Sequence, residues 1–155
     1  MKALISSYFT FLKNSSNQHG VHSPFVYSLV TKCFYDKEKK PEYSLLKQYR
    51  NRLLQNKNSI MVTDFGAGSR VFKSNEREVS KIAKTAGITN KRAKLLFRIM
   101  QYFKPNNVLE IGTSLGLGTS ALALGNPDAK IISLEGCPKT AATAQENLNH
   151  FNLNN

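Results

Sequence analysis

Apolar residues recur every three or four positions over most of residues 1–104, which is the spacing of one face of a helix. The pattern predicts helices over 1–14, 23–33, 41–56, 75–86 and 89–104. Helix-start signals support this: Pro24 follows Ser23, Thr89 precedes a long apolar stripe, and Asn75 with Glu78 has the spacing of a capping box. The residues expected on inner faces include Leu45, Leu46, Tyr49 and Leu53 in the third helix, and Ala93, Leu96, Phe97, Met100 and Phe103 in the fifth.

The pattern changes after residue 105, where short β-rich runs alternate with helical ones. Residues 106–112 and 129–136 predict strands, and residues 116–125 and 138–151 predict helices. Strand, helix, strand and helix at this spacing predict a parallel βαβα unit and an α/β fold class. We therefore expect a mostly helical N-terminal region over 1–104 and the start of a sheet domain over 105–155.

Two strands do not make a stable parallel sheet, because such a sheet must be covered on both faces. We therefore expect the chain to be the front part of a longer protein, with the domain that begins at residue 105 truncated. A homodimer that completes the sheet between two chains is the other solution.

Length and composition fit one globular domain. The 155 residues are 41% hydrophobic and 21% charged, which is too apolar for a disordered chain. No apolar run approaches the roughly 20 residues that span a bilayer. Ser6, Ser7 and Thr10 interrupt the apolar start, so we predict neither a membrane span nor a signal peptide. Two cysteines, Cys33 and Cys137, are too few for a disulfide framework, which predicts a cytoplasmic location.

Charge is distributed unevenly along the chain. Residues 1–105 carry 20 basic and 6 acidic side chains, whereas residues 106–155 carry 2 and 4, which together give a net charge of +12. Such asymmetry occurs in proteins that bind nucleic acids or membrane surfaces. However, no nucleic-acid module accompanies it. We favour a basic helical face in solvent, or against an acidic partner, and keep nucleic acid as an open partner class.

The sequence V-L-E-I-G-T-S-L-G-L-G-T-S at 108–120 carries the candidate chemistry. Gly112 ends the first strand, at the sheet edge where open α/β folds bind ligands. Gly112 permits a sharp turn, Gly116 leaves the backbone open to a ligand, and the following helix start offers N–H donors. Glu135 ends the second strand 23 residues after Gly112, where a carboxylate accepts hydrogen bonds from both hydroxyls of a ribose.

The glycine spacing indicates which nucleoside cofactor binds. A dinucleotide site requires G-x-G-x-x-G directly after the strand, whereas Gly112, Gly116 and Gly118 form G-x-x-x-G-x-G, a wider turn without a tight pyrophosphate cradle. With Glu110, the string E-x-G-x-x-x-G resembles the first motif of class I S-adenosylmethionine-dependent methyltransferases, and residues 110–125 are similar to their small-molecule O-methyltransferase branch. The segments H-G-V-H-S-P-F-V-Y-S-L-V and T-D-F-G-A-G-S-R also resemble uncharacterised bacterial members. The resemblance, close over 106–151, implies the start of a Rossmann-like sheet that binds S-adenosyl-L-methionine.

The resemblance also implies roles for individual residues. Glu110 would orient the loop and the methionine amino group, Gly112 and Thr113 would present backbone to the amino-acid part of the cofactor, and Glu135 would hold the ribose. The remaining implied contacts are Ser114, Gly116 and Gly118 in the loop, Thr119 as a helix cap, and Gly136 and Cys137 along the adenine edge. Plainer roles stay open, namely helix–sheet packing for Gly116 and Gly118 and solvated strand ends for Glu110 and Glu135.

The implied reaction is methyl transfer to an O or N atom of an acceptor, with a small molecule as the favoured acceptor class. Because the base or metal ligands of the family mostly follow later strands, no catalytic residue and no metal site is assigned, and His19 and His22 lack a third ligand. We expect the segment T-D-F-G-A-G-S-R to form a turn in the N-terminal region; the less favoured alternative is that Ser69, Arg70 and Lys73 close over an anionic group of the cofactor or acceptor. Two other functions stay open: an NAD(P)-dependent oxidoreductase, and a basic, non-catalytic nucleic-acid adaptor.

Overall fold

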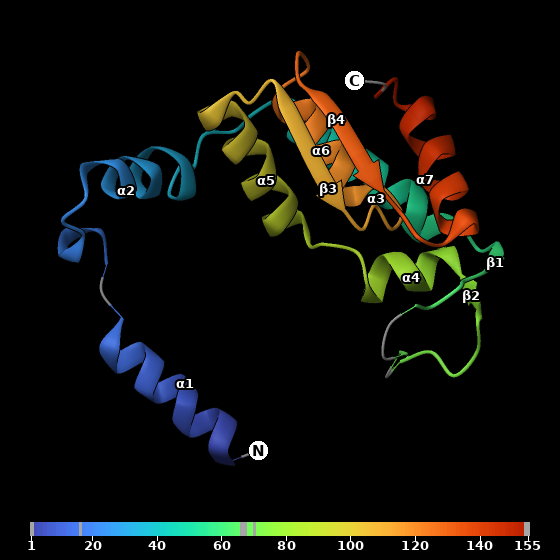
Figure 1. Cartoon of the computed structure of the whole chain (residues 1–155), viewed down its shortest axis with the longest axis horizontal. Helices are drawn as coiled ribbons and strands as arrows, with labels where there is room; N and C mark the ends of the chain where they lie inside the picture. Colours follow the sequence, from blue (N-terminus) through green and yellow to red (C-terminus); the bar gives the residue numbers. More distant parts are fainter. Residues whose placement is uncertain (1, 16, 66–67, 70, 154–155) are drawn as a thin grey trace. The chain divides into compact units, whose positions relative to one another are not determined.

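The chain combines helices with short strands in an α/β arrangement, and the computed structural model describes residues 2–15, 17–65, 68–69 and 71–153 (Figure 1). It divides into two compact units, Met1–Asp36 and Lys37–Asn155. Residues 37–104 therefore share a unit with the parallel sheet. The change expected at 104/105 is thus a change of local pattern inside the second unit.

The first unit consists of short helices. These are α1 (Lys2–Asn14), the 3-10 turn η1 (Gln18–Gly20), α2 (Pro24–Leu29) and the π-helical turn η2 (Val30–Phe34). Ser23 begins α2 as predicted, because its hydroxyl accepts the Val26 N–H and Pro24 follows it. The apolar stripe of α1 is exposed, with Leu4 and Phe9 among its members. None of the helices in the described part of the chain has the length and apolar run that a bilayer crossing requires.

The second unit holds the remaining elements. In chain order they are α3 (Tyr43–Gln55), β1 (Ser59–Met61), β2 (Glu76–Glu78), α4 (Val79–Thr85), α5 (Asn90–Phe103), β3 (Asn107–Ile111), α6 (Leu117–Gly125), β4 (Lys130–Leu134) and α7 (Pro138–His150). Thr89 caps α5 as predicted, accepting the Arg92 N–H. The capping box expected at Asn75 and Glu78 is wrong, because residues 76–78 pair with β1 as an antiparallel strand and α4 begins only at Val79.

Strands β3 and β4 form a parallel pair, with Asn107 opposite Lys130 and Ile111 opposite Leu134. Helix α6 connects the two strands and packs against α5 and α3. Figure 1 shows α6 and α3 on one side of this sheet, with α7 returning along it after β4. The predicted parallel strand–helix–strand–helix order is therefore confirmed, and it brings the carboxyl ends of β3 and β4 to the same edge.

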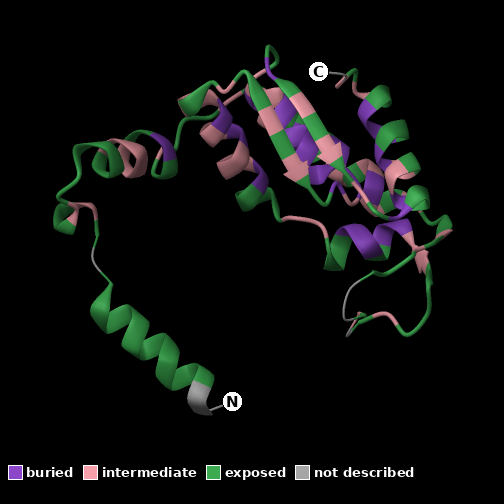
Figure 2. Ribbon diagram, viewed as in Figure 1, coloured by how far each residue is buried: buried purple, intermediate pink, exposed green. Residues whose placement is uncertain are grey.

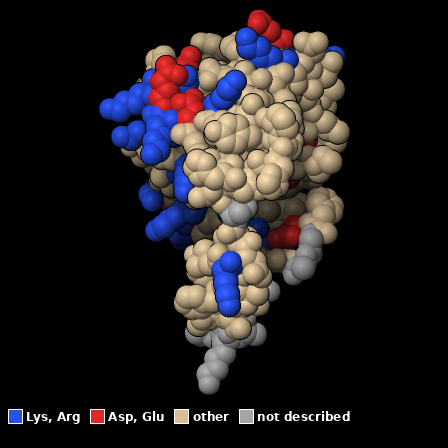
Figure 3. Space-filling view, turned by 90° about the vertical axis from the view of Figure 1, so that its left-hand side faces the viewer, with Lys and Arg blue, Asp and Glu red and all other residues tan. Residues whose placement is uncertain are grey.

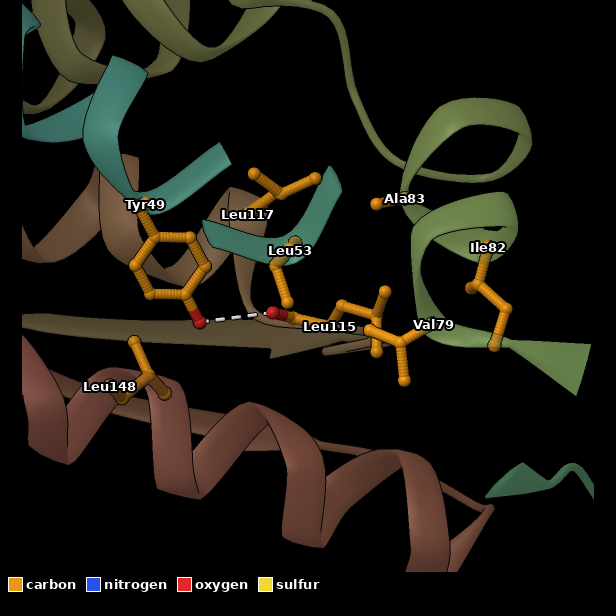
Figure 4. Close-up of a cluster of buried hydrophobic side chains, with 8 residues drawn as sticks. All are labelled: Tyr49, Leu53, Val79, Ile82, Ala83, Leu115, Leu117 and Leu148. Atoms are coloured by element: carbon orange, nitrogen blue, oxygen red, sulfur yellow. Dashed lines mark hydrogen bonds between the residues drawn. The ribbon is translucent and has the colours of Figure 1, made fainter. Parts of the chain in front are cut away.

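A hydrophobic cluster joins the helices to the turn that follows β3 (Figure 4). Its buried members are Tyr49, Leu53, Val79, Ile82, Ala83, Leu115, Leu117 and Leu148. Leu46, Tyr49 and Leu53 are buried as predicted, at a spacing of three and four residues along α3. Leu45 is 38% exposed because it lies one residue off that stripe, and Phe103 is 48% exposed because it is the last residue of α5. These two inward predictions are wrong.

The opposite face of the parallel sheet is apolar and exposed. Its large side chains are Leu109, Ile111, Ile132 and Leu134, which alternate with half-buried neighbours along β3 and β4 (Figure 2). A parallel sheet is normally covered on both faces. Within the described residues, this sheet is covered on one.

Candidate functional site

We call Gly112–Gly116 the glycine loop, because it joins β3 to α6 through alternating left-handed residues. Gly112, Ser114 and Gly116 have φ angles of 95°, 51° and 77°. Thr113 and Leu115 lie between them with buried side chains. The glycines adopt such angles freely, whereas the left-handed Ser114 stores strain of about 1–2 kcal/mol. The conformation of this loop therefore favours glycine at both of its ends, Gly112 and Gly116.

The first N–H groups of the loop are used within the protein. The Gly112 and Thr113 N–H groups both donate to the Leu134 carbonyl, at 2.8 and 3.1 Å. They continue the pairing of β3 with β4 past the end of the strand. These two N–H groups are therefore not free to bind a ligand, which would have to contact other backbone atoms of Gly112 and Thr113.

Glu110 lies on the half-buried side of β3, and its carboxylate accepts hydrogen bonds from two hydroxyl groups. Its Oε2 accepts the Thr119 hydroxyl at 2.6 Å and the Ser133 hydroxyl at 2.5 Å. Gly118 makes room for this carboxylate, since a Cβ there would lie 2.5 Å from Glu110 Oε1. The predicted helix cap at Thr119 is wrong: Gly116 is the N-cap of α6, and the Thr119 hydroxyl is drawn to Glu110 instead. Glu110 thereby links β3, β4 and the first turn of α6.

Tyr49 on α3 closes the inner side of the glycine loop. Its hydroxyl donates to the Leu115 carbonyl at 2.9 Å (Figure 4), and a Cβ at Gly116 would lie 2.3 Å from the same hydroxyl oxygen. Burial raises the pKa of Tyr49, and the charge of Glu110 raises it further, so the hydroxyl stays a donor. The expectation that Gly116 leaves its backbone open to a ligand is wrong on this side, because α3 fills the space.

Glu135 follows β4 and turns back toward the glycine loop. Its Oε2 accepts the Ser114 N–H at 2.7 Å, and its Oε1 accepts the Cys137 N–H at 3.0 Å. These two bonds fix the direction of the carboxylate. An ionised carboxylate has about four acceptor positions, so about two remain for other donors.

A cavity of about 620 Å³, the larger cavity, lies where the glycine loop faces the end of β4. Five predicted site residues line it: Gly112, Ser114, Glu135, Gly136 and Cys137. A Cβ at Gly112 would meet no atom within 4 Å, so this end of the loop is open. The volume falls within the range of about 300–1,000 Å³ that small-molecule sites occupy.

A smaller cavity of about 130 Å³ lies against the same loop. Its lining includes Glu110, Thr113 and Gly118, and it shares Gly112 and Ser114 with the larger cavity. The structure therefore brings eight of the ten predicted site residues to two cavities that have Gly112 and Ser114 in common. Gly116 and Thr119 line neither of them.

The larger cavity has a further wall that the sequence did not reveal as part of the site. Thr63, Asp64 and Phe65 line it, together with Arg77 of β2. Arg77 holds this wall, because its Nη2 lies 3.1 Å from Asp64 Oδ2 and its Nε donates to the Ser74 carbonyl at 3.2 Å. The available signal was Asp64, an acidic residue directly before a glycine turn.

Ser69 and Lys73, offered above as residues that could close over an anionic group, do not line the larger cavity. The Ser69 hydroxyl accepts the N–H groups of Val71 and Phe72, which makes it part of a local turn. Lys73 lines a separate hollow beside Lys81. Arg70 lies outside the described residues, as do Gly66 and Ala67.

Cys137 attaches the wall to the start of α7. It is 2% exposed, and its Sγ accepts the Thr63 N–H at 3.3 Å and faces the Met61 carbonyl at 3.7 Å. Burial alone would raise the pKa of this thiol, but hydrogen bonds from Thr140, Thr63 and Lys139 outweigh it and lower the pKa. The sulfur is thus occupied in holding two segments together.

The charge around the two cavities is opposite in sign to that of the chain. Asp64, Glu110 and Glu135 line them, whereas Arg77 is the one basic side chain among their described lining residues and is paired with Asp64. Elsewhere Lys and Arg gather on the surface with acidic side chains among them (Figure 3). Within the described ranges, no three His, Cys, Asp or Glu side chains are placed to hold a metal ion.

Comparison of the chain with protein-family models, curated proteins and solved structures finds no match. The candidate site therefore stands on its own geometry: two carboxylates, an open glycine and two adjoining cavities at the carboxyl edge of a parallel strand pair.

Proposed function

We propose that this chain is the cofactor-binding part of an S-adenosyl-L-methionine-dependent methyltransferase with a Rossmann-like sheet, which transfers a methyl group to an O or N atom of an acceptor. The observation that carries the proposal is the pair of carboxylates, Glu110 and Glu135, on two cavities that are both lined by Gly112. A nucleoside joined to an amino acid suits two such neighbouring compartments.

The residues present fit the cofactor. Glu135 has about two acceptor positions left after its bonds to the chain, which suits the two hydroxyls of a ribose. The larger cavity adds apolar side chains for a base, including Val62, Ile111 and Leu134. Glu110 lines the smaller cavity, which would take the amino-acid end in this proposal. Gly112 lines both cavities, and a Cβ built on it would meet no atom within 4 Å, so the backbone is open to a ligand there.

Charge favours this cofactor over a nicotinamide dinucleotide. A dinucleotide brings an anionic pyrophosphate, which needs free N–H groups at the start of a helix. In the loop that leads from β3 to α6, the N–H groups of Gly112, Thr113 and Ser114 already donate to acceptors of the chain and do not add to such a site. The nearby side chains are carboxylates, which repel a pyrophosphate and attract a sulfonium and an ammonium group.

The chemistry asks little of the protein beyond alignment. When bound, the cofactor supplies a methyl group that its sulfonium already activates. The chain has to hold that group in line with an acceptor, and such positioning is worth about 7–11 kcal/mol in well-oriented reactions. Glu135 and Glu110 have binding roles in this proposal, and neither is assigned a proton transfer.

Isothermal titration calorimetry tests the proposal. The chain is titrated with S-adenosylmethionine, S-adenosylhomocysteine, NAD⁺ and NADPH, and only the first two are expected to bind. Glu135→Ala should weaken their binding by about 1–3 kcal/mol, or about 5- to 150-fold, because ribose hydroxyls lose their acceptor.

A charge-matched control is Glu146→Ala on α7, whose side chain is 72% exposed and pairs with Arg52 at 3.5 Å, away from both cavities. Its affinity for either ligand should equal that of the wild type. Absent binding to the wild-type chain, or tighter binding of NAD⁺ than of S-adenosylmethionine, would contradict the proposed function.

A further inference from the structure

The wall formed by residues 62–65 is fastened at several points. The Val62 N–H donates to the Asn75 carbonyl at 2.8 Å, and the Thr63 N–H donates to Cys137 Sγ at 3.3 Å. Asp64 is paired with Arg77, whose guanidinium also lies 5.0 Å from the centre of the Phe72 ring. Residues more than 70 positions apart in the sequence are thereby held at one rim of the larger cavity.

Phe65 ends this wall and lies directly over Gly136. A Cβ at Gly136 would lie 3.1 and 3.2 Å from two atoms of the Phe65 ring, so only glycine lets the ring rest there unmoved. The ring contacts the chain along this edge, yet Phe65 is 77% exposed and lines the larger cavity. An aromatic ring held at a cavity rim with most of its surface free presents a ready stacking platform.

Gly136 is also the neighbour of Glu135, the residue proposed to hold the ribose. In a nucleoside the base is attached to C1′, which is bonded to C2′, one of the two carbons that bear the ribose hydroxyls. A base whose sugar is held by Glu135 therefore lies within one sugar length of Gly136 and of the ring above it.

We infer that Phe65 stacks on the nucleobase of the bound cofactor, so that the segment before the sheet, and not only the strand ends, forms the base subsite. This inference rests on the proposed function and adds a residue outside the glycine loop to the site. Base–aromatic stacking typically changes affinity by about tenfold or more. The contribution of Phe65 to affinity should therefore be seen with ligands that contain the base and be absent with ligands that contain only the amino-acid part.

The absence of tryptophan from the sequence allows a direct test. Phe65→Trp introduces a single tryptophan at the rim, and its fluorescence should be quenched by S-adenosylmethionine and by adenosine but not by L-methionine. Phe11→Trp is the matched control, because Phe11 is 65% exposed on α1 in the other unit and its replacement should respond to none of the three.

Calorimetry with two further variants gives an independent readout. Phe65→Ala should bind both S-adenosylmethionine and adenosine about tenfold or more weakly. Gly136→Ala should weaken them as well, because its methyl group displaces the ring. Circular dichroism checks that each variant is folded. We expect Phe65→Ala to fold, because the Phe65 side chain is mostly exposed.

The outcomes separate this inference from the proposed function. If wild type and Phe65→Trp bind S-adenosylmethionine calorimetrically but the emission does not change and Phe65→Ala binds normally, the stacking role is overturned while the proposed function stands. If the wild-type chain binds neither S-adenosylmethionine nor adenosine, the proposed function fails and the stacking role fails with it.

Discussion

The two ends of the glycine loop face different surroundings, although both are glycines with positive φ. At Gly112 a side chain would meet no atom within 4 Å, whereas at Gly116 it would lie 2.3 Å from the Tyr49 hydroxyl oxygen. The first end opens on the cavities, and the second packs against α3. Three residues of sequence therefore separate a cavity-facing backbone from a core-facing one.

The contrast shows that glycine can be required in this motif for two reasons, a positive φ angle and the lack of space for a side chain. Gly112 needs glycine for its φ of 95° alone, while Gly116 needs it for its φ of 77° and for the space that Tyr49 occupies. Glu110 and Glu135 repeat the contrast. Glu110 accepts hydroxyls of the chain around α6, and Glu135 is turned by backbone N–H groups toward the larger cavity.

The largest expected effect is that of Gly116→Ala. Left-handed strain and overpacking against a buried tyrosine should together lower the free energy of unfolding by about 3–5 kcal/mol. The matched variant Gly112→Ala should lose only the strain, about 1–2 kcal/mol. Urea denaturation followed by circular dichroism measures both. Equal losses for the two variants would remove the distinction between the ends of the loop.

A second, smaller effect is expected at the residue that fills the space. Tyr49→Phe deletes the donor to the Leu115 carbonyl and should cost about 1–2 kcal/mol of unfolding free energy. In the Gly116→Ala background the same change should cost less or even stabilise, because it removes the clashing oxygen. Additive losses in this double-mutant cycle would show that the two residues do not interact.

The same variant carries a pH signature. Because burial raises the pKa of Tyr49 above its ordinary value of 10.0, the stabilisation from its protonated hydroxyl is complete below pH 10. This stabilisation is lost as the pH rises from 10 toward the folded-state pKa, because over that range the tyrosine loses its proton in the unfolded chain but keeps it in the folded one. The stability gap between wild type and Tyr49→Phe should therefore narrow above pH 10.

The smallest effect is expected at Ser114, between the two glycines. Its φ of 51° is strained for serine, while its N–H bond to Glu135 does not depend on the side chain. Ser114→Gly should therefore change the unfolding free energy by no more than about 1 kcal/mol, since relieved strain offsets the added chain entropy. Ser114→Val, with a β-branched side chain, should be clearly less stable than Ser114→Gly in the same denaturation measurement.

Much of the fold followed from local pattern. Ser23 and Thr89 begin helices where the sequence predicts them, and β3 and β4 pair in parallel as the strand–helix spacing implies. The capping box at Asn75 failed because a good local signal was overridden by pairing with β1, whose residues lie well upstream. Helix capping depends on residues within one turn of the chain, whereas strand pairing depends on the backbone donors and acceptors of another segment.

The site was predictable in outline and not in its walls. The strand ends marked Glu110 and Glu135, and the glycine spacing marked the loop between them. Nothing local marked Phe65 or Arg77, because their position at the larger cavity depends on the bond from Thr63 to Cys137 and on the Asp64 pair. Long-range bonds of this kind leave no periodicity in the sequence.

By itself, the sequence determined most of the helices, the strand–helix order after residue 105 and the residue types at the edge of the parallel strands, because each of these depends on neighbours within a turn or a strand. Only the tertiary structure decided which glycine faces a cavity and which faces the core. Tyr49 and Leu115, whose hydrogen bond closes one side of the loop, are 66 residues apart. Packing between such distant segments sets where space remains, and that space is what a ligand can use.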